Sequence, residues 1–274
     1  MGNESTTVSS LMVPLVHLTV FKCIYFFAGP ARKGDLKFWL QEICEEKHIV
    51  LQMHEFDLLR GGPGNDLSIL GVQQHWINRL EEFNAVVVTP PCSTFSRAPW
   101  ANSMGPVPVR SARYPDGFPW LSNQLRSKAV LGNSLVQFHW DCLQRVHQLQ
   151  NHLNITGFGE HPEDLGRVRG KGPGDIPASI WRSQQYRSLM DNNWWSAGFK
   201  QDALGAPTAK PTRAISNSWE FEAFGTSGPP TFDVDGFYTG PILRSLDVPK
   251  VSLLRKKGDT GPFRTAQALS LIHI

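Results

Sequence analysis

The sequence predicts an α/β protein with a doubly wound, mostly parallel sheet and a small irregular lobe toward its C-terminal end. Along residues 16–213, short apolar segments rich in β-branched and aromatic residues alternate with segments of helical periodicity. Residues 84–89 (NAVVVT) are apolar at nearly every position, as expected for a strand that helices cover on both faces. Polar residues with chemical potential follow several predicted strands, and ligands of such sheets bind beyond the strands' carboxyl ends.

The first unit is a strand, a glycine-containing turn and a helix. Residues 16–27 form an apolar run rich in Val, Ile, Tyr and Phe that ends in an Ala-Gly-Pro turn. In the next segment, residues 31–47, Leu36, Leu40 and Ile43 recur at helical spacing, which predicts a helix.

The next two units repeat the alternation. A strand is predicted over 49–57, and turn residues separate it from a helix over 67–83. The strand over 84–89 then leads into a long segment, 93–123, that is rich in Pro, Gly, Ser and Arg and lacks periodicity. Loops of that length inside a compact domain are usually functional or disordered. A long helix is predicted over 127–149.

The last units are shorter. A strand is predicted over 154–158, a loop over 163–178 and a helix over 180–190. Strands are predicted again over 194–200 and over 214–221.

Composition limits the classes of function. The chain of 274 residues is 41% hydrophobic, enough for one sizeable core, and its net charge of +3 permits a nucleic-acid partner without requiring one. Four scattered Cys without a Cys-x-x-Cys pair predict neither zinc nor a disulfide framework, and they fit a reducing compartment. No apolar run approaches the roughly 20 residues of a membrane span. We therefore expect an intracellular protein, cytoplasmic or nuclear, that binds no metal and is a monomer.

A cysteine after the third predicted strand is the first candidate for chemistry. Pro90 and Pro91 stiffen the backbone before Cys92, because proline fixes its own φ and restricts the residue before it. A nucleophile benefits from such a fixed position, and Arg97 could lower the pKa of the thiol. A lone buried Cys beside a proline turn is more often structural. The strand before Cys92 and the long polar loop after it favour a functional role.

The segment 89–98 (TPPCSTFSRA) resembles the proline-cysteine motif of the DNA cytosine-5 methyltransferases. That motif continues with a Phe-Ser pair, here Phe95 and Ser96. The segment is also similar to methyltransferase-like sequences of phages and of mobile elements of some protists. The resemblance covers about residues 21–213 and implies a Rossmann-like class I methyltransferase fold, with S-adenosylmethionine as cofactor and DNA as partner.

Other motifs of the family follow in order. Phe27, Ala28 and Gly29 resemble the first motif, at the methionine part of the cofactor, although Ala31 stands where the family has a second Gly. The resemblance implies three further contacts with the cofactor. Glu55 or Asp57 would bind the ribose, Asp66 would lie near the adenine, and Pro90 of the proline-cysteine motif would also contact the cofactor.

Two later motifs are implied to serve the base. Residues 159–162 resemble the motif whose Glu contacts cytosine, which makes Glu160 catalytic, while His161 replaces the usual Asn. Residues 205–213, from Gly-Ala-Pro onward, resemble the motif with basic residues near base and phosphate. In this chain that motif is reduced to Lys210, expected to bind substrate, and Arg213, expected to be catalytic.

The implied reaction starts with attack of the Cys92 thiolate on C6 of a cytosine that is flipped out or single-stranded. Arg97 and Arg213 are expected to hold the nucleotide, and Ser93 and Ser96 to bind it as well. The remaining basic residues of the loop 93–128 are expected to contact phosphates, unless they form an ordinary solvated loop: Arg110, Arg113, Arg126 and Lys128.

The expected organisation has four parts. Residues 1–15 form a loose extension, 16–213 the methyltransferase domain, 214–260 a small target-recognition or irregular lobe, and 261–274 a shortened C-terminal segment. That lobe is small for a reader of base edges, so sequence specificity is low or comes from a partner.

Three other interpretations compete with an active enzyme. A catalytically silent relative that binds nucleic acid or cofactor, within a mobile element, would fit the departures at Ala31 and His161. A nicotinamide-dependent enzyme would need Gly-x-Gly-x-x-Gly after the first strand, and that pattern is absent. A methyltransferase acting on amino groups normally has an aromatic residue after Pro-Pro, and here Cys92 follows.

Overall fold

The computed structural model describes residues 19–31, 34–57, 61–101, 106–170, 176–204, 206, 208–241 and 243. The predicted N-terminal extension (1–15) and C-terminal segment (261–274) lie outside these residues, as do Gly205 and Pro207 of the last motif.

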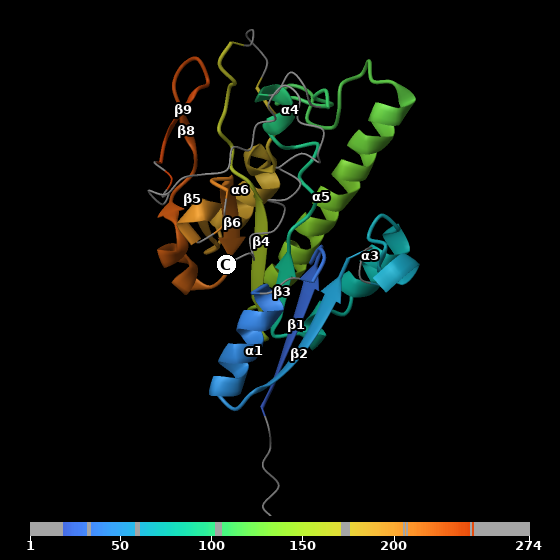
Figure 1. Ribbon diagram of the computed structural model, residues 1–274, viewed down its shortest axis with the longest axis vertical. Coiled ribbons are helices and arrows are strands. Elements are labelled where there is room, and N and C mark those ends of the chain that lie inside the picture. The colour runs from blue at the N-terminus through green and yellow to red at the C-terminus, as the bar shows by residue number, and fades with distance from the viewer. Residues whose placement is uncertain are drawn as a thin grey trace, which may run out of the picture.

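A seven-stranded sheet forms the centre of the described fold, in the order β2-β1-β3-β4-β6-β5-β7 (Figure 1). Its parallel half consists of β2 (Val50–Phe56), β1 (Val20–Phe26), β3 (Ala85–Val88) and β4 (Thr156–Pro162). The chain moves outward from β1 to β2 and then returns to the other side of β1 with β3. In sheets with such a reversal of direction, ligands generally bind beyond the carboxyl ends of the strands on either side of it, here β1 and β3.

The other half of the sheet is antiparallel. β6 (Pro211–Ser216) lies between β4 and β5 (Trp195–Lys200) and runs antiparallel to both, and β7 (Thr226–Ser227) pairs antiparallel with β5. The predicted α/β class is therefore confirmed, but the sheet is mixed, with parallel pairing only from β2 to β4.

Helices cover both faces of the sheet (Figure 1). One face packs against α1 (Leu36–Glu46), and the other packs against α3 (Leu70–Ile77), α5 (Asn123–Leu149) and α6 (Gln184–Met190). β1 shows how alternation serves the two layers, because Tyr25 belongs to the α1 side and Phe26 to the α5 side. The remaining helical elements are short: η1 (Gly62–Asn65), η2 (Leu80–Glu82), α4 (Ala98–Ala101), η3 (Ile180–Arg182), η4 (Gln201–Leu204) and η5 (Trp219–Phe224).

The last predicted strand is wrong in its position. The strand is β6, which ends at Ser216, whereas the second half of the predicted 214–221 segment enters η5. Asn217 explains the end of the strand. Its side chain accepts a hydrogen bond from the backbone N–H of Gly157 (2.7 Å) and donates one to the carbonyl of Ile155 (2.9 Å), so it fastens the turn to the start of β4.

The predicted boundary between residues 213 and 214 falls inside β6. β6 and β7 belong to the main sheet, so the lobe begins later than predicted. Within the described residues, the predicted lobe corresponds to a two-stranded hairpin. Its strands are β8 (Thr231–Phe232) and β9 (Tyr238–Gly240). Residues 244–260 of the predicted lobe lie outside the described residues.

Candidate active site

The turn after β1 has a strained backbone. Phe27 has φ of +64° and Gly29 has φ of +66°, and the first of these is unusual for a side chain of its size. The N–H groups of Phe27 and Ala28 both donate to the carbonyl of Phe56 at the end of β2, over 2.7 and 3.1 Å. These bonds hold the predicted cofactor turn at the carboxyl ends of β1 and β2.

The predicted acids take different positions around this turn. The Asp57 carboxylate accepts the N–H of Gly29 over 3.1 Å, so it stabilises the turn itself. Glu55 pairs with Tyr25 in the sheet register, and its half-buried carboxylate lies 3.6 Å from the ammonium of Lys37. Asp66 precedes α3, and its carboxylate accepts the backbone N–H of Ser68 over 2.9 Å. Hydrogen bonds from the side chain and the backbone of Ser68 lower the pKa of Asp66.

A hydrogen-bonded turn presents the predicted nucleophile. Pro90 and Cys92 are buried after β3, and the backbone N–H groups of Phe95 and Ser96 donate to the carbonyl of Cys92 over 3.1 and 2.8 Å. The Ser96 hydroxyl then accepts the N–H of Ala98 (3.1 Å) at the start of α4. Ser96 therefore stabilises the turn, while Ser93 is exposed.

Cys92, Glu160 and Lys210 lie together although 118 positions separate the first from the last. The Lys210 Nζ atom is 3.3 Å from Glu160 Oε1, and both side chains are almost completely buried. Burial raises the pKa of the Cys92 thiol, and the nearby Lys210 cation opposes that effect. The structure therefore brings the predicted nucleophile and the predicted base-binding carboxylate together around one buried cation.

Lys210 shifts the pKa values of Cys92 and Glu160, and both of these groups shift the pKa of Lys210. Burial raises the pKa of Glu160, against the effects of Lys210 and of a hydrogen bond from Thr212. Burial alone would lower the pKa of Lys210, but the neighbouring Glu160 and Cys92 reverse this and raise it. Lys210 is thus held as a cation, which can stabilise negative charge on a sulfur or on a bound base.

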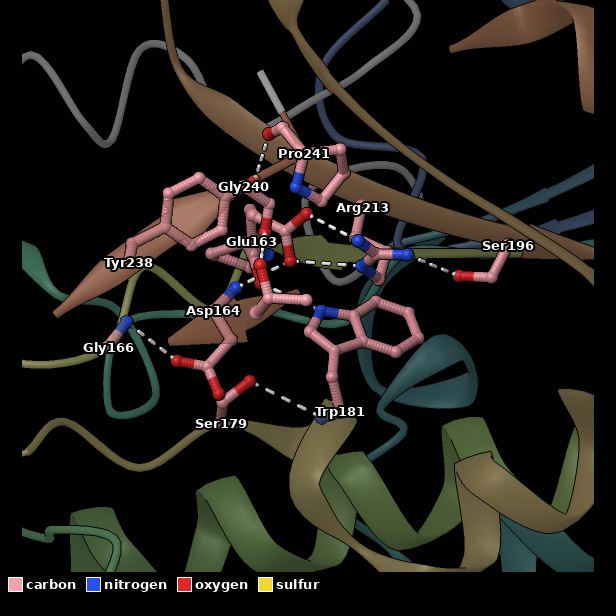
Figure 2. A network of polar contacts seen from close by, with 12 residues as sticks. Glu163, Asp164, Gly166, Ser179, Trp181, Ser196, Arg213, Tyr238, Gly240 and Pro241 are labelled. Carbon is pink, nitrogen blue, oxygen red and sulfur yellow. Dashed lines mark hydrogen bonds and ion pairs between the residues drawn. The ribbon is translucent and has the colours of Figure 1, made fainter. Parts of the chain in front are cut away.

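Arg213 lies on the other face of β6 and does not join this cluster. Its partner in the sheet register is His161, whereas Glu160 is opposite Ala214, and neighbouring residues of a strand point to opposite faces. The Arg213 guanidinium is fully buried and donates to both Glu163 oxygens, over 2.9 and 2.8 Å (Figure 2). The predicted catalytic contact is replaced by a buried ion pair that fastens β6 to the segment after β4.

Two other residues predicted to contact nucleic acid have partners within the protein. Arg97 donates to the carbonyls of Leu165 (3.3 Å) and Arg167 (3.2 Å), which joins the segment after Cys92 to the segment after β4. Arg110 is 1% exposed, and its guanidinium carbon lies 3.9 Å from the centre of the Phe95 ring. Two backbone carbonyls accept hydrogen bonds from the Arg97 guanidinium, and the Arg110 guanidinium lies over the Phe95 ring. Both side chains therefore stabilise the loops around the site.

Sequence reasoning missed the structural roles of Arg110, Thr212 and Glu163. Thr212 alternates with Arg213 along β6 and faces the opposite way, but the strand was predicted to begin at residue 214, so the sequence did not place either residue on a strand. Nothing local in the sequence distinguishes Arg110 from the exposed Arg113, since only packing between distant segments buries the first.

Comparison of the chain with known protein-family models and with curated proteins finds no match. Within the described residues, no group of three or more His, Cys, Asp and Glu side chains could hold a metal ion. A search of the same residues for a helix long and apolar enough to cross a membrane finds none.

Proposed function

We propose that this chain transfers a methyl group from S-adenosylmethionine to C5 of a cytosine in DNA, through a covalent adduct with Cys92. The observation that carries the proposal is the meeting of Cys92, Glu160 and Lys210 beside the carboxyl ends of β3 and β4. Parallel strands with a reversal of order between β1 and β3 are compatible with the Rossmann-like methyltransferase fold that the motifs imply.

The turn after β1 fits a nucleoside cofactor. A Cβ atom added to Gly29 would meet no atom within 4 Å, so the space before the turn is open to a ligand. Asp57 accepts the N–H of Gly29 and Glu55 lies 3.6 Å from Lys37, so either acid would exchange an existing contact to bind the two ribose hydroxyls. When bound, S-adenosylmethionine would supply an electrophilic methyl group on a sulfonium centre. The protein's part is to hold that centre near C5 of the base.

Cys92 is the nucleophile that makes C5 reactive. Addition of its thiolate to C6 of cytosine forms a carbon–sulfur bond and moves electron density to C5. Burial raises the pKa of the thiol, so the resting enzyme holds a neutral thiol. The thiol proton passes to water before the attack, and Lys210 is the group that favours the resulting anion. After methylation, water takes the C5 proton, the carbon–sulfur bond breaks, and its electron pair returns to sulfur as the Cys92 thiolate.

Glu160 supports the attack at the far side of the ring. Burial raises its pKa, so it can hold a proton more readily than an exposed glutamate. A hydrogen bond from Glu160 to the N3 edge of cytosine would offset the negative charge that develops during addition. Lys210, 3.3 Å from Glu160, keeps this carboxyl in position in the absence of a base.

Trapping of a covalent adduct tests the proposal. The protein is incubated with S-adenosylmethionine and DNA that contains 5-fluorocytosine, whose fluorine blocks the final elimination. We expect a denaturation-resistant protein–DNA adduct that mass spectrometry maps to Cys92. Cys92→Ser should abolish it, whereas Cys44→Ser, at a buried cysteine of α1, should not.

Two outcomes would contradict the proposal. Transfer of labelled methyl groups by Cys92→Ser would exclude the covalent route. Absence of an adduct from folded, cofactor-bound protein would favour the silent-module interpretation, in which the same turns bind cofactor or nucleic acid without reaction.

A further inference from the structure

An exposed tryptophan stands on the segment between α4 and α5. Trp120 is 68% exposed, and its ring is stacked on Phe118 with centres 5.0 Å apart and planes 10° apart. Tyr114 packs edge-on against both rings, at 5.9 and 5.4 Å. We call residues 109–121 the aromatic loop. One face of the Trp120 ring is therefore covered by Phe118, while most of the side chain faces solvent.

Hydrogen bonds from several directions fix the aromatic loop. The N–H of Phe118 donates to the carbonyl of Val109 (2.9 Å), and Arg110 donates to the carbonyl of Pro115 (2.6 Å). Arg126 of α5 donates to the carbonyl of Pro119 (3.1 Å), directly beside Trp120. The exposed ring is thus held in place before any partner binds, which lowers the entropy cost of binding.

The aromatic loop is built onto the Cys92 turn. Arg110, within the loop, stacks on the ring of Phe95 in that turn. The ring of Phe118 packs edge-on against the ring of Trp100 in α4, with ring centres 6.4 Å apart. Figure 1 shows residues 106–122, which lead into α5, beyond the carboxyl ends of the parallel strands. A chain of nucleotides leading away from a base at Cys92 would therefore meet this surface.

Charge favours a polyanion at this surface. Residues 106–128 expose three basic side chains and only one acid, Asp116; the basic side chains are Arg113, Arg126 and Lys128. The charge of Asp116 acts on buried Arg110, whose pKa is lowered to about 10 mainly by burial. Arg113 is exposed next to the aromatic rings, with its guanidinium carbon 5.5 Å from the centre of the Tyr114 ring.

We infer that the aromatic loop binds unpaired DNA, with a base stacked on Trp120 and a neighbouring phosphate on Arg113. Flat exposed aromatic rings next to basic side chains are the usual means of binding single strands without reading their sequence. The inference rests on the proposed function for the identity of the partner, and it adds the surface that holds the strand next to the reacting base.

Fluorescence anisotropy with a labelled thymidine 12-mer at low salt tests the inference. We expect Trp120→Ala to weaken binding about tenfold, because one stacked base contributes roughly that factor. Trp120→Phe should retain most of the affinity. Trp219→Ala removes another tryptophan of nearly equal exposure (70%), far along the chain in η5, and should bind like wild type.

The outcomes separate this inference from the proposed enzyme activity. Equal affinities for Trp120→Ala and Trp219→Ala, or a wild type that does not bind the 12-mer, would overturn the aromatic loop as a DNA surface. Neither result changes the adduct test at Cys92. Conversely, a failed adduct test leaves the loop inference standing on its own measurement, which is the difference in affinity for the 12-mer between Trp120→Ala and Trp219→Ala.

Discussion

At the scale of single residues, Lys210 is the group on which the candidate site depends. Its ammonium is buried 3.3 Å from Glu160 and acts electrostatically on Cys92, so one cation balances two groups that can become anions. Buried charges are retained when they are paired, and removing one partner leaves the other uncompensated. Lys210 was predicted to bind substrate; its position suits it equally to favour the Cys92 thiolate.

Lys210→Met should shift the pH dependence of Cys92 alkylation to higher pH. The reason is that the cation opposes the rise in thiol pKa caused by burial. Alkylation by iodoacetamide, followed at Cys92 by peptide mass spectrometry, measures the shift, and Lys210→Arg should largely prevent it. An unchanged profile in Lys210→Met would show that the cation does not act on the sulfur.

Stability separates this effect from simple unfolding. Lys210→Met leaves Glu160 buried without its counter-charge, which should lower the free energy of unfolding by about 3–5 kcal/mol. The double variant with Glu160→Gln should recover much of that loss.

At the scale of elements, α5 supports the Cys92 turn through a glycine. A Cβ atom added to Gly132 would lie 2.4 Å from the Thr94 hydroxyl and 3.1 Å from a guanidinium nitrogen of Arg110. The bare backbone of the helix therefore lets the turn and Arg110 pack against it. The Cys92 turn is thus supported by the face of a helix that begins 31 residues after Cys92.

Gly132→Ala should destabilise the protein by about 1–3 kcal/mol, because the added methyl group overpacks the contact with Thr94. Helix propensity alone predicts the opposite sign, a gain of about 1 kcal/mol. Gly71→Ala in α3 is the matched control, since a Cβ atom there meets nothing within 4 Å, and it should stabilise or leave stability unchanged. Urea unfolding of both variants measures the difference, and a stabilised Gly132→Ala would refute the packing argument.

At the scale of the whole molecule, the layer between the sheet and α5 contains buried histidines. His139 of α5 is fully buried, with its Nδ1 atom 2.5 Å from the hydroxyl of Tyr186 in α6. Burial lowers the pKa of His139 to about 3. The buried His161 also has a pKa well below the ordinary value, for which burial is the largest cause and His139 the next. Both rings are therefore neutral in the folded protein at neutral pH.

The free energy of unfolding should fall as pH drops below about 6.5. The unfolded chain then binds a proton at His139, whereas the folded protein does not until about pH 3, so the unfolded state binds more protons over that window. His139 alone contributes a slope of about 1.4 kcal/mol per pH unit between these values. His139→Gln should flatten the dependence measured by urea unfolding between pH 7 and 4.5, and His152→Gln, at an exposed position, serves as control. Equal slopes in wild type and His139→Gln would contradict the argument.

Much of the architecture follows from local patterns. The strand before Cys92 was predicted from a short apolar run, and the long helix was placed within a few residues of α5. The strand predicted over 154–158 is β4, which continues to Pro162, so Glu160 lies within the strand and not in a turn after it. Alternation and helical spacing report directly on which side chains are buried, so elements with strong periodicity are readable from sequence. The 214–221 strand was misplaced because the contacts of Asn217 that end β6 come from a segment about 60 positions away.

The sequence by itself determined the α/β class and the turn after β1, because apolar periodicity and turn residues are local features. The roles of Cys92 and Glu160 come from the resemblance of their motifs to the methyltransferases and stay predictions. Only the tertiary structure decided that Lys210 joins these two residues while Arg213 faces away and Arg110 is buried. The physical reason is that these contacts depend on how β6 pairs between β4 and β5, and on which loop covers which side chain. Pairing register and burial are set by contacts between distant segments, and no local pattern records them.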